Sequence, residues 1–222
     1  MAEGDKIASE WLETHGKISM VVALESWLAG KLHSIHAHPE ALVVAVEEAE
    51  LATVSCLQTP NKVLLVVEQP QPRAPQLSGG WHFALDDIRD PGNLGTIIRI
   101  ADWFGMANVF CSPNCAEIYS PKVVQAAMGG HLRVNVCEQE LTTFLRQSML
   151  PVFGATIDGE NYLDMKLPKA GILLIGNESK GIAPGLVDLC AALVTIPRYG
   201  GAESLNAAVS AGILAAGVHV GR

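Results

Sequence analysis

The stretch that most constrains the fold of this chain is residues 196–212, with the sequence IPRYGGAESLNAAVSAG. It follows an apolar run at residues 191–196 that predicts a buried parallel strand. The glycine pair at 200–201 permits backbone paths that other residues resist, and Ser204 is a suitable N-cap for an apolar helix over residues 205–218. A strand, a glycine-bearing loop and a helix N-terminus together present backbone N–H groups and polar side chains to a ligand. Taken alone, the pattern also suits a tight structural connection.

The same order of strand, loop and helix repeats from residue 81 to the end of the chain. Strands are predicted at 81–88, 107–111, 133–136, 151–156, 170–176 and 191–196, and helices at 93–104, from Ser120–Pro121 onward, at 139–147 and at 205–218. The dipeptide Asp158–Gly159 predicts a turn that closes the fourth of these strands. Such alternation indicates an α/β fold with parallel strands in one doubly wound sheet.

Charge and length narrow the classes of function. The 222 residues carry 15 basic and 23 acidic side chains, for a net charge of −8, and most of the acidic excess lies in the N-terminal third. Any RNA contact must therefore come from positioned Arg and Lys side chains rather than from bulk charge. The sequence shows no secretory signal and no apolar run near the roughly 18 residues that span a bilayer. Its five irregularly spaced cysteines do not predict a disulfide framework, so we expect a cytoplasmic protein.

The N-terminal part has a pattern of its own, with a helix predicted at 7–12 and strands at 19–24, 43–46 and 62–67. The residues His33, His36 and His38 lack a carboxylate or cysteine at ligand spacing, so we interpret them as a solvated loop rather than a metal site. A stretch rich in Pro and Gly then predicts an extended linker. The chain is thus divided into a small N-terminal domain (residues 1–69), a linker (residues 70–80) and a larger C-terminal domain (residues 81–222).

Three polar loops follow strands of the C-terminal domain: DPGNLGTIIR at 90–99, GNESKG at 176–181 and PRYGGAESLN at 197–206. All three lie at the carboxyl ends of predicted parallel strands, where open α/β sheets bind ligands. Together they carry six polar side chains of chemical interest: Asn93, Arg99, Asn177, Glu178, Ser204 and Asn206. None of them contains GxGxxG, GxxxxGKS/T or GxSxG, so dinucleotide binding, nucleoside triphosphate binding and hydrolase chemistry lose their usual support.

Three motifs in these loops resemble those of the SpoU/TrmH family of RNA ribose 2′-O-methyltransferases, within the knotted SPOUT superfamily. They are NLGTIIRIADWFG, LLIGNESKGI and IPRYGGAESLNAAVSAGI, in the order and separation of the family, so the resemblance spans about residues 81–222. Residues 1–69 are similar to the family's small N-terminal substrate-binding domain, whose fold is like that of a ribosomal protein; SCLQTPNKVLLVV is the most recognisable piece. Such domains usually have an earlier strand and helix, so the resemblance also implies a truncated start.

The resemblance implies methyl transfer from S-adenosyl-L-methionine to a ribose 2′-OH of tRNA or rRNA, in a C-terminal deep trefoil knot and without a metal or a membrane. The catalytic residues that it implies are Arg99, Asn93, Glu178, Ser204 and Asn206. The implied cofactor-binding residues are Thr156, Gly176, Asn177, Ile196 and Leu205, and the implied RNA-binding residues are Arg99, Lys122 and Arg198, the last in place of a common Met. The helices at 93–104 and 205–218 carry apolar surface that packs either within the monomer or across a dimer, and the resemblance favours a homodimer.

Arg99 matches the catalytic arginine of the family. A guanidinium stays protonated, so we expect it to clamp the adjacent phosphate and to stabilise a developing alkoxide rather than to act as a base. Ser204 suits a helix cap as well as a ribose contact, and Lys122 suits a solvated side chain as well as an RNA contact. A ribosomal-protein-like domain favours rRNA over tRNA, while its acidic charge opposes tight RNA binding, so the substrate class stays open. The alternatives are a catalytically silent RNA-binding relative and an unrelated nucleotide-binding α/β enzyme.

Overall fold

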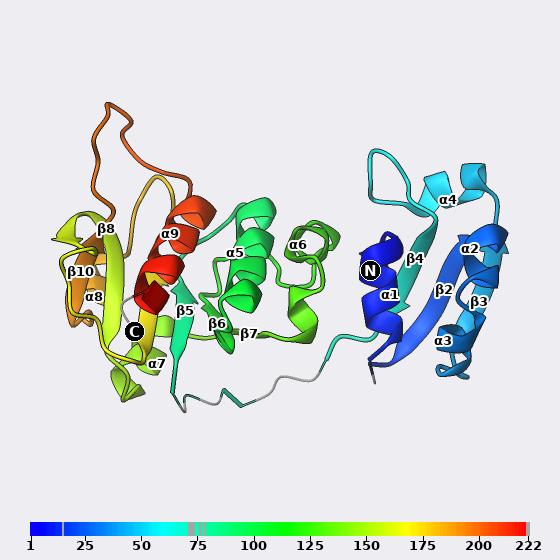
Figure 1. Cartoon of the computed structure of the whole chain (residues 1–222), viewed down its shortest axis with the longest axis horizontal. Helices are drawn as coiled ribbons and strands as arrows, with labels where there is room; N and C mark the ends of the chain where they lie inside the picture. The colour runs from blue at the N-terminus through cyan, green and yellow to red at the C-terminus, as the bar shows by residue number, and fades with distance from the viewer. Residues whose placement is uncertain (15, 71–73, 76, 78, 221–222) are drawn as a thin grey trace.

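The computed structural model describes residues 1–14, 16–70, 74–75, 77 and 79–220. Two units, each with its own sheet, lie side by side (Figure 1). The N-terminal unit, residues 1–67, is drawn in blue and cyan, and the C-terminal unit, residues 81–220, runs from green to red. The predicted linker falls between the two units, but its residues 71–73, 76 and 78 lie outside the described part of the chain.

The N-terminal unit is a four-stranded sheet with helices. Its elements are β1 (Ala2–Glu3), α1 (Asp5–Leu12), β2 (Ile18–Leu24), α2 (Glu25–Ala29), α3 (Leu32–His36), β3 (Leu42–Val46), α4 (Glu48–Val54) and β4 (Val63–Val67). The strand order is β1-β4-β2-β3, and β2 pairs in parallel with β3 and antiparallel with β4. The helix and the three strands that the sequence predicts here are confirmed, with their bounds shifted by one or two residues.

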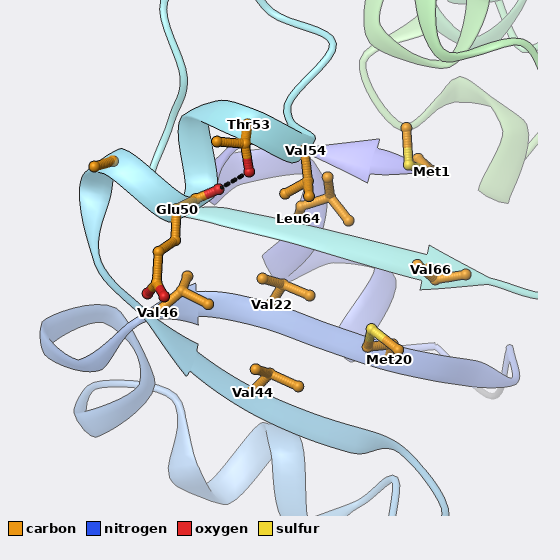
Figure 2. A pocket seen from close by; sticks show the side chains of 11 residues that line it. Met1, Met20, Val22, Val44, Val46, Glu50, Thr53, Val54, Leu64 and Val66 are labelled. Atoms are coloured by element: carbon orange, nitrogen blue, oxygen red, sulfur yellow. Dashed lines mark hydrogen bonds between the residues drawn. The ribbon is translucent and has the colours of Figure 1, made fainter.

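Successive side chains of this sheet point to opposite faces, as a strand requires. Val21 and Leu65 face a buried core that also contains Ile7 and Trp11 of α1. The alternate residues line an apolar hollow of about 670 Å³ on the other face, seen in Figure 2, with Met1, Met20, Val22, Val44, Val46, Val54, Leu64 and Val66 in its lining. The lining contains no residue that the sequence predicts for catalysis or cofactor binding.

The C-terminal unit is a six-stranded sheet. Its elements are β5 (Trp81–Leu85), α5 (Pro91–Trp103), β6 (Asn108–Cys111), α6 (Pro121–Ala127), η1 (Gly130–Leu132), β7 (Asn135–Glu138), α7 (Leu141–Gln147), β8 (Val152–Asn161), β9 (Gly171–Ile175), α8 (Pro184–Val187), β10 (Ala192–Thr195) and α9 (Ala207–Val220). The strand order is β10-β8-β9-β5-β6-β7, and every pairing is parallel. The predicted α/β fold with a parallel sheet is therefore confirmed.

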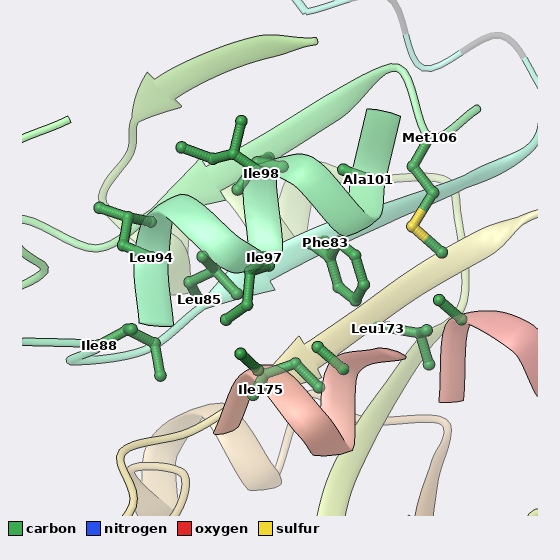
Figure 3. Packing of buried hydrophobic residues seen from close by; sticks show 14 of the residues in the cluster. Phe83, Leu85, Ile88, Leu94, Ile97, Ile98, Ala101, Met106, Leu173 and Ile175 are labelled. Carbon is green, nitrogen blue, oxygen red and sulfur yellow. The ribbon is translucent and has the colours of Figure 1, made fainter. Parts of the chain in front are cut away.

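Strand β5 lies inside this sheet, and none of its residues is more than 1% exposed. Helices α5 and α9 cover one face, where Leu94, Ile97 and Ala101 of α5 belong to the same buried cluster as Phe83 and Leu173 (Figure 3). Helices α7 and α8 cover the other face through Leu141, Leu145 and Leu186. Because both faces are covered, β5 and β9 at the centre of the sheet are buried along their whole length, as the central strands of parallel sheets usually are.

Two predicted helices of this unit are present, but each begins two residues from its predicted start. Helix α5 begins at Pro91, before the predicted Asn93, because proline suits the first helical position and Asp90 Oδ1 accepts the Asn93 N–H at 2.8 Å. Helix α9 begins at Ala207, after the predicted residue 205. Its cap is Asn206 rather than Ser204, because Asn206 Oδ1 accepts the N–H groups of Ala208 at 2.9 Å and Val209 at 3.2 Å.

The prediction of a turn at Asp158–Gly159 was wrong, since β8 continues through both residues. Strand β10 pairs with β8 before and after this point, with a register shift between Leu193 and Val194. A Cβ on Gly159 would lie 2.6 Å from the carbonyl carbon of Leu193. The glycine therefore permits close approach of the β10 backbone instead of forming a turn.

Two smaller predictions were wrong as well. The histidine cluster begins in helix α3, not in a loop, because Ile35 is buried at 6% exposure and anchors that helix to the core. The strand predicted at 133–136 is β7 at Asn135–Glu138, because the residues just before it complete the 3₁₀ turn η1, from which Arg133 N–H donates to Gly130.

Candidate active site

The three predicted polar loops meet at one edge of the C-terminal sheet. They follow β5, β9 and β10, and β5 and β9 are neighbours whose carboxyl ends lie at the same edge. Asn93, Glu178 and Asn206, one from each loop, are joined by hydrogen bonds although they lie far apart in the sequence. The three loops therefore meet through these side chains.

Asn93 is the middle of this group, which we call the amide relay (Asn93, Glu178 and Asn206). Asn93 Nδ2 donates to Glu178 Oε1 at 2.5 Å, and Asn206 Nδ2 donates to Asn93 Oδ1 at 2.8 Å. Because Asn206 Oδ1 also caps α9, the relay ties the first turns of α5 and α9 to the loop that carries Glu178. The orientation of each amide is therefore set by its partners.

Asn177 holds the Glu178 loop in shape. Its Nδ2 donates to the carbonyl of Asp87 at 2.8 Å, and its Oδ1 accepts from the backbone N–H groups of Ser179 and Lys180. Its own N–H and C=O pair with Gly181. The Asn177 side chain is thus fixed by partners in its own loop and at the end of β5, so this residue supports the loop that carries Glu178.

Arg99 lies on the exposed side of α5, about 9 Å along the helix axis from Asn93. Within the described residues, no carboxylate forms an ion pair with Arg99, so its guanidinium is free to bind an anion such as a phosphate. Lys122 is exposed on α6, which packs against α5. Arg198 is exposed in the loop before α9, where its Nη1 lies 3.4 Å from the carbonyl of Ala202.

The predicted cofactor residues lie on β8, at the end of β9 and around the last loop. A Cβ on Gly176 would lie 2.4 Å from the carbonyl carbon of Gly181, so only glycine fits there. Thr156 Oγ1 is buried and has no hydrogen-bond partner within the described structure. Ile196 packs against the core, while Leu205 is 46% exposed. A buried hydroxyl without a partner in the described structure indicates a place for a polar ligand.

Ser204 is exposed in the same loop and does not cap α9. Of the two roles that the sequence suggests for Ser204, the helix cap is therefore excluded. Its neighbours in residues 198–206 are exposed too, so the loop offers its polar groups to the outside.

Sequence reasoning missed the role of Asp86 and Asp87, the acids at the end of β5. Asp86 Oδ2 accepts the N–H of Ala183 at 2.8 Å. Asp87 has a φ of 58°, and its carboxylate contacts Arg89 Nε at 2.6 Å and Lys180 Nζ at 3.5 Å. The hydrogen bond from Arg89 holds the pKa of Asp87 below its ordinary value. The sequence does carry a signal for this role, because two adjacent acids directly follow a buried strand. The carboxyl ends of parallel strands form the edge of the sheet where ligands bind.

The described residues contain no group of three or more His, Cys, Asp or Glu side chains placed to hold a metal ion. Within the same residues, no helix is both long and apolar enough to cross a membrane.

Comparison with known proteins agrees with this geometry. The model of the SpoU rRNA Methylase family matches residues 80–216. The 23S rRNA (guanosine(2553)-2′-O)-methyltransferase RlmP of Bacillus subtilis is 30% identical over 173 residues, which are 76% of this chain and 69% of that protein. The chain spans 44% to 62% of the length of the next curated relatives.

Solved structures match nearly the whole chain. A TrmH-family protein from Porphyromonas gingivalis is 33% identical, with a TM-score of 0.85 over 98% of this chain and 88% of that one. An AdoMet-bound rRNA methyltransferase from Sinorhizobium meliloti is 29% identical, with a TM-score of 0.87 over 99% of this chain and 86% of that one. Because these scores cover both units, the two sheets superimpose together. The chain belongs to the SpoU rRNA methylase family.

Proposed function

We propose that this protein transfers a methyl group from S-adenosylmethionine to a ribose 2′-hydroxyl of ribosomal RNA. The observation that carries the proposal is the amide relay, which brings three polar loops together beside the free guanidinium of Arg99. The name of the Bacillus subtilis relative supports 23S rRNA as the substrate class. An RNA substrate of this class also implies a cytoplasmic location.

The residues present fit S-adenosylmethionine, which supplies an electrophilic methyl group on a sulfonium when bound. The hydroxyl of Thr156 and the backbone around Gly176, Ile196 and Leu205 would hold it, since a buried hydroxyl without a partner awaits a polar group. The AdoMet-bound structure of the Sinorhizobium meliloti relative supports the same cofactor.

The C-terminal loops would form the trefoil knot of the family. Two glycines support this part of the proposal, because each allows backbone to pass where a side chain would block it. Gly176 lies against the backbone of Gly181 and Ile182, and Gly159 lies against the backbone of Leu193 and Val194. Knots are rare in proteins, and close backbone crossings are a condition for a tight one.

Arg99 would perform the main chemical work of this chain. A ribose 2′-hydroxyl is a weak acid, and Arg99 stays protonated, so it cannot take the proton. Its fork of N–H donors would bind the neighbouring phosphate and stabilise negative charge that develops on the 2′-oxygen, while the proton leaves to water. The amide relay would hold Glu178 and the start of α5 in fixed geometry, and Ser204 would contact the ribose.

The N-terminal unit would bind RNA as a domain of about residues 1–69, and Lys122 and Arg198 would add phosphate contacts. The active form would be a homodimer through α5 and α9. The outward side of α9 is apolar and small, with Val209 at 50% exposure beside Gly212 and Ile213, and Trp103 at the end of α5 is 84% exposed. Apolar surface of this kind usually marks an interface.

The test is methyl transfer from labelled S-adenosylmethionine into total RNA from a strain that lacks the gene, separated afterwards into rRNA and tRNA. Wild-type protein is compared with Arg99→Ala and with Arg146→Ala, a control on α7 at the other face of the sheet. We expect label in rRNA that only Arg99→Ala loses. Label confined to tRNA would change the substrate class. Absence of label with intact cofactor binding would indicate a silent RNA-binding relative.

A further inference from the structure

Arg133, just after η1, joins the two units of the molecule. Its Nε donates to both carboxylate oxygens of Asp102, at 2.9 Å and 3.0 Å, and its Nη1 donates to Glu10 Oε2 at 3.1 Å. Asp102 lies on α5, the helix that carries Asn93 and Arg99, whereas Glu10 lies on α1 of the N-terminal unit. Among the ion pairs of the described residues, the one between Arg133 and Glu10 joins one unit to the other.

Apolar packing surrounds this ion-pair bridge. Val124 of α6 is 6% exposed and belongs to the core of the N-terminal unit, and Met128 and Leu132 pack against the same core. Gly129, with a φ of +83°, brings the chain so close to Glu10 that a Cβ there would meet Glu10 Oε2. Figure 1 shows α6 between α5 and the N-terminal unit. The contact is therefore built from packing as well as from charge.

The geometry of the bridge favours one orientation of the units over others. A guanidinium is planar and presents its donors in fixed directions, so an arginine that binds two carboxylates restricts both. The solved relatives have the same relative orientation of the two sheets, because both sheets superimpose on them together.

We propose that Arg133 is a positioning residue, which holds the N-terminal unit at a fixed orientation to α5 so that one RNA contacts both units at once. This inference rests on the proposed function. Arg133 touches neither the RNA nor the reacting atoms; it acts through Glu10 and Asp102. An RNA that bridges two fixed units loses less freedom on binding than one that must first order them, so the bridge lowers the KM for RNA and leaves the chemical step unchanged.

The experiment compares Arg133→Gln and the milder Glu10→Gln with wild-type protein and with Arg146→Gln, a charge-matched control on α7. Three quantities are measured: the KM and kcat for rRNA methylation, the affinity for S-adenosylmethionine by calorimetry, and the radius of gyration by small-angle X-ray scattering. We expect about a 5- to 10-fold rise in KM for both variants, a larger radius of gyration for Arg133→Gln, and a kcat and cofactor affinity within about twofold of wild type. Arg133→Lys, which keeps the charge and loses the fork, should recover part of the loss.

A fall in kcat with an unchanged KM would overturn the inference, and so would identical scattering curves and KM values for all proteins. The double variant Glu10→Gln/Arg133→Gln should be no worse than Arg133→Gln alone, because Arg133→Gln already removes the ion pair with Glu10. If wild-type protein methylates no RNA, the proposed function fails, and the scattering comparison still decides whether Arg133 orients the units.

Discussion

Asn206 donates a hydrogen bond of 2.8 Å from its Nδ2 to Oδ1 of Asn93, a residue 113 positions earlier in the chain. Its own Oδ1 caps α9 through the N–H groups of Ala208 and Val209. One side chain thus has two separable duties, since one amide atom stabilises a helix and the other orients the amide relay.

The two duties of Asn206 can be separated by substitution. Serine caps a helix about as well as asparagine but is too short to reach Asn93, so Asn206→Ser should keep the free energy of unfolding within about 0.5 kcal/mol. The same variant should lose about 10- to 100-fold in kcat. Asn206→Ala should lose kcat and also about 1 kcal/mol of stability. Urea unfolding and single-turnover methylation check both, and full activity of Asn206→Ser would show that the relay does not matter.

Arg99→Lys tests the geometry of the guanidinium. Lysine keeps the charge but lacks the planar fork, so we expect kcat to fall by about 10²-fold while S-adenosylmethionine affinity stays within about twofold. Single-turnover kinetics and calorimetry measure the two quantities. Turnover near that of wild type would mean that charge alone is enough and would contradict the phosphate-clamp role.

Gly176→Ala should weaken cofactor binding. The new Cβ would lie 2.4 to 2.5 Å from the backbone of Gly181 and Ile182, so the loop must shift at the proposed cofactor site. We expect at least about a 10-fold loss of S-adenosylmethionine affinity and a destabilisation of about 1 to 3 kcal/mol. Gly185→Ala is the matched control, because nothing lies within 4 Å of its Cβ position. Calorimetry and thermal unfolding of both variants settle the comparison.

His131 should make stability sensitive to acid. Burial lowers the pKa of His131 to about 4. Its Nε2 faces the carbonyl of Ile118 at 3.0 Å, and its buried Nδ1 has no hydrogen-bond partner among the described residues. Because the folded pKa lies below the ordinary 6.5, this contribution is complete above pH 6.5 and is lost as the pH falls toward 4. From about pH 7.5 to about pH 5 the loss is roughly 2 kcal/mol.

Urea unfolding at several pH values checks this dependence, with His131→Gln as the comparison because glutamine does not titrate. The pKa of the buried His82 is also lowered by burial, so the free energy of unfolding of both proteins also falls as the pH is lowered because of His82. The His131→Gln protein should therefore show the smaller loss. Equal slopes for the two proteins would rule out His131 as a source.

Val209→Glu should separate the proposed dimer. A carboxylate on the apolar outward side of α9 must be desolvated in any interface that covers it, which costs far more than exposure in a monomer. We expect a monomeric mass by light scattering at micromolar concentration. Met149→Glu, at a position 96% exposed after α7, should keep the mass of wild type. A monomeric wild-type protein would contradict the homodimer itself.

Much of the C-terminal unit could be predicted from the sequence, because several strands are short apolar runs and β5, β9 and β10 are followed by glycine-bearing loops. The continuation of β8 through Asp158–Gly159 could not be predicted, since this dipeptide is typical of turns. The nearness of the β10 backbone decided the outcome there. The partners of Asn93 were likewise invisible, because a sequence shows which residues are polar and near a ligand edge but not which side chains meet. Ser204 has a side chain suited to a helix cap, but it stands two residues before Asn206, which caps α9.

The amide relay also has a consequence for the time at which activity arises. During synthesis the N-terminal unit, β5 and α5 are complete long before residue 206 is made, because domains fold in order as the chain emerges. Until residue 178 is made Asn93 has neither partner, and until residue 206 is made it has only Glu178. A nascent or prematurely ended chain therefore has the helix with Arg99 but no assembled site, so competence for methylation arrives only with the last helix.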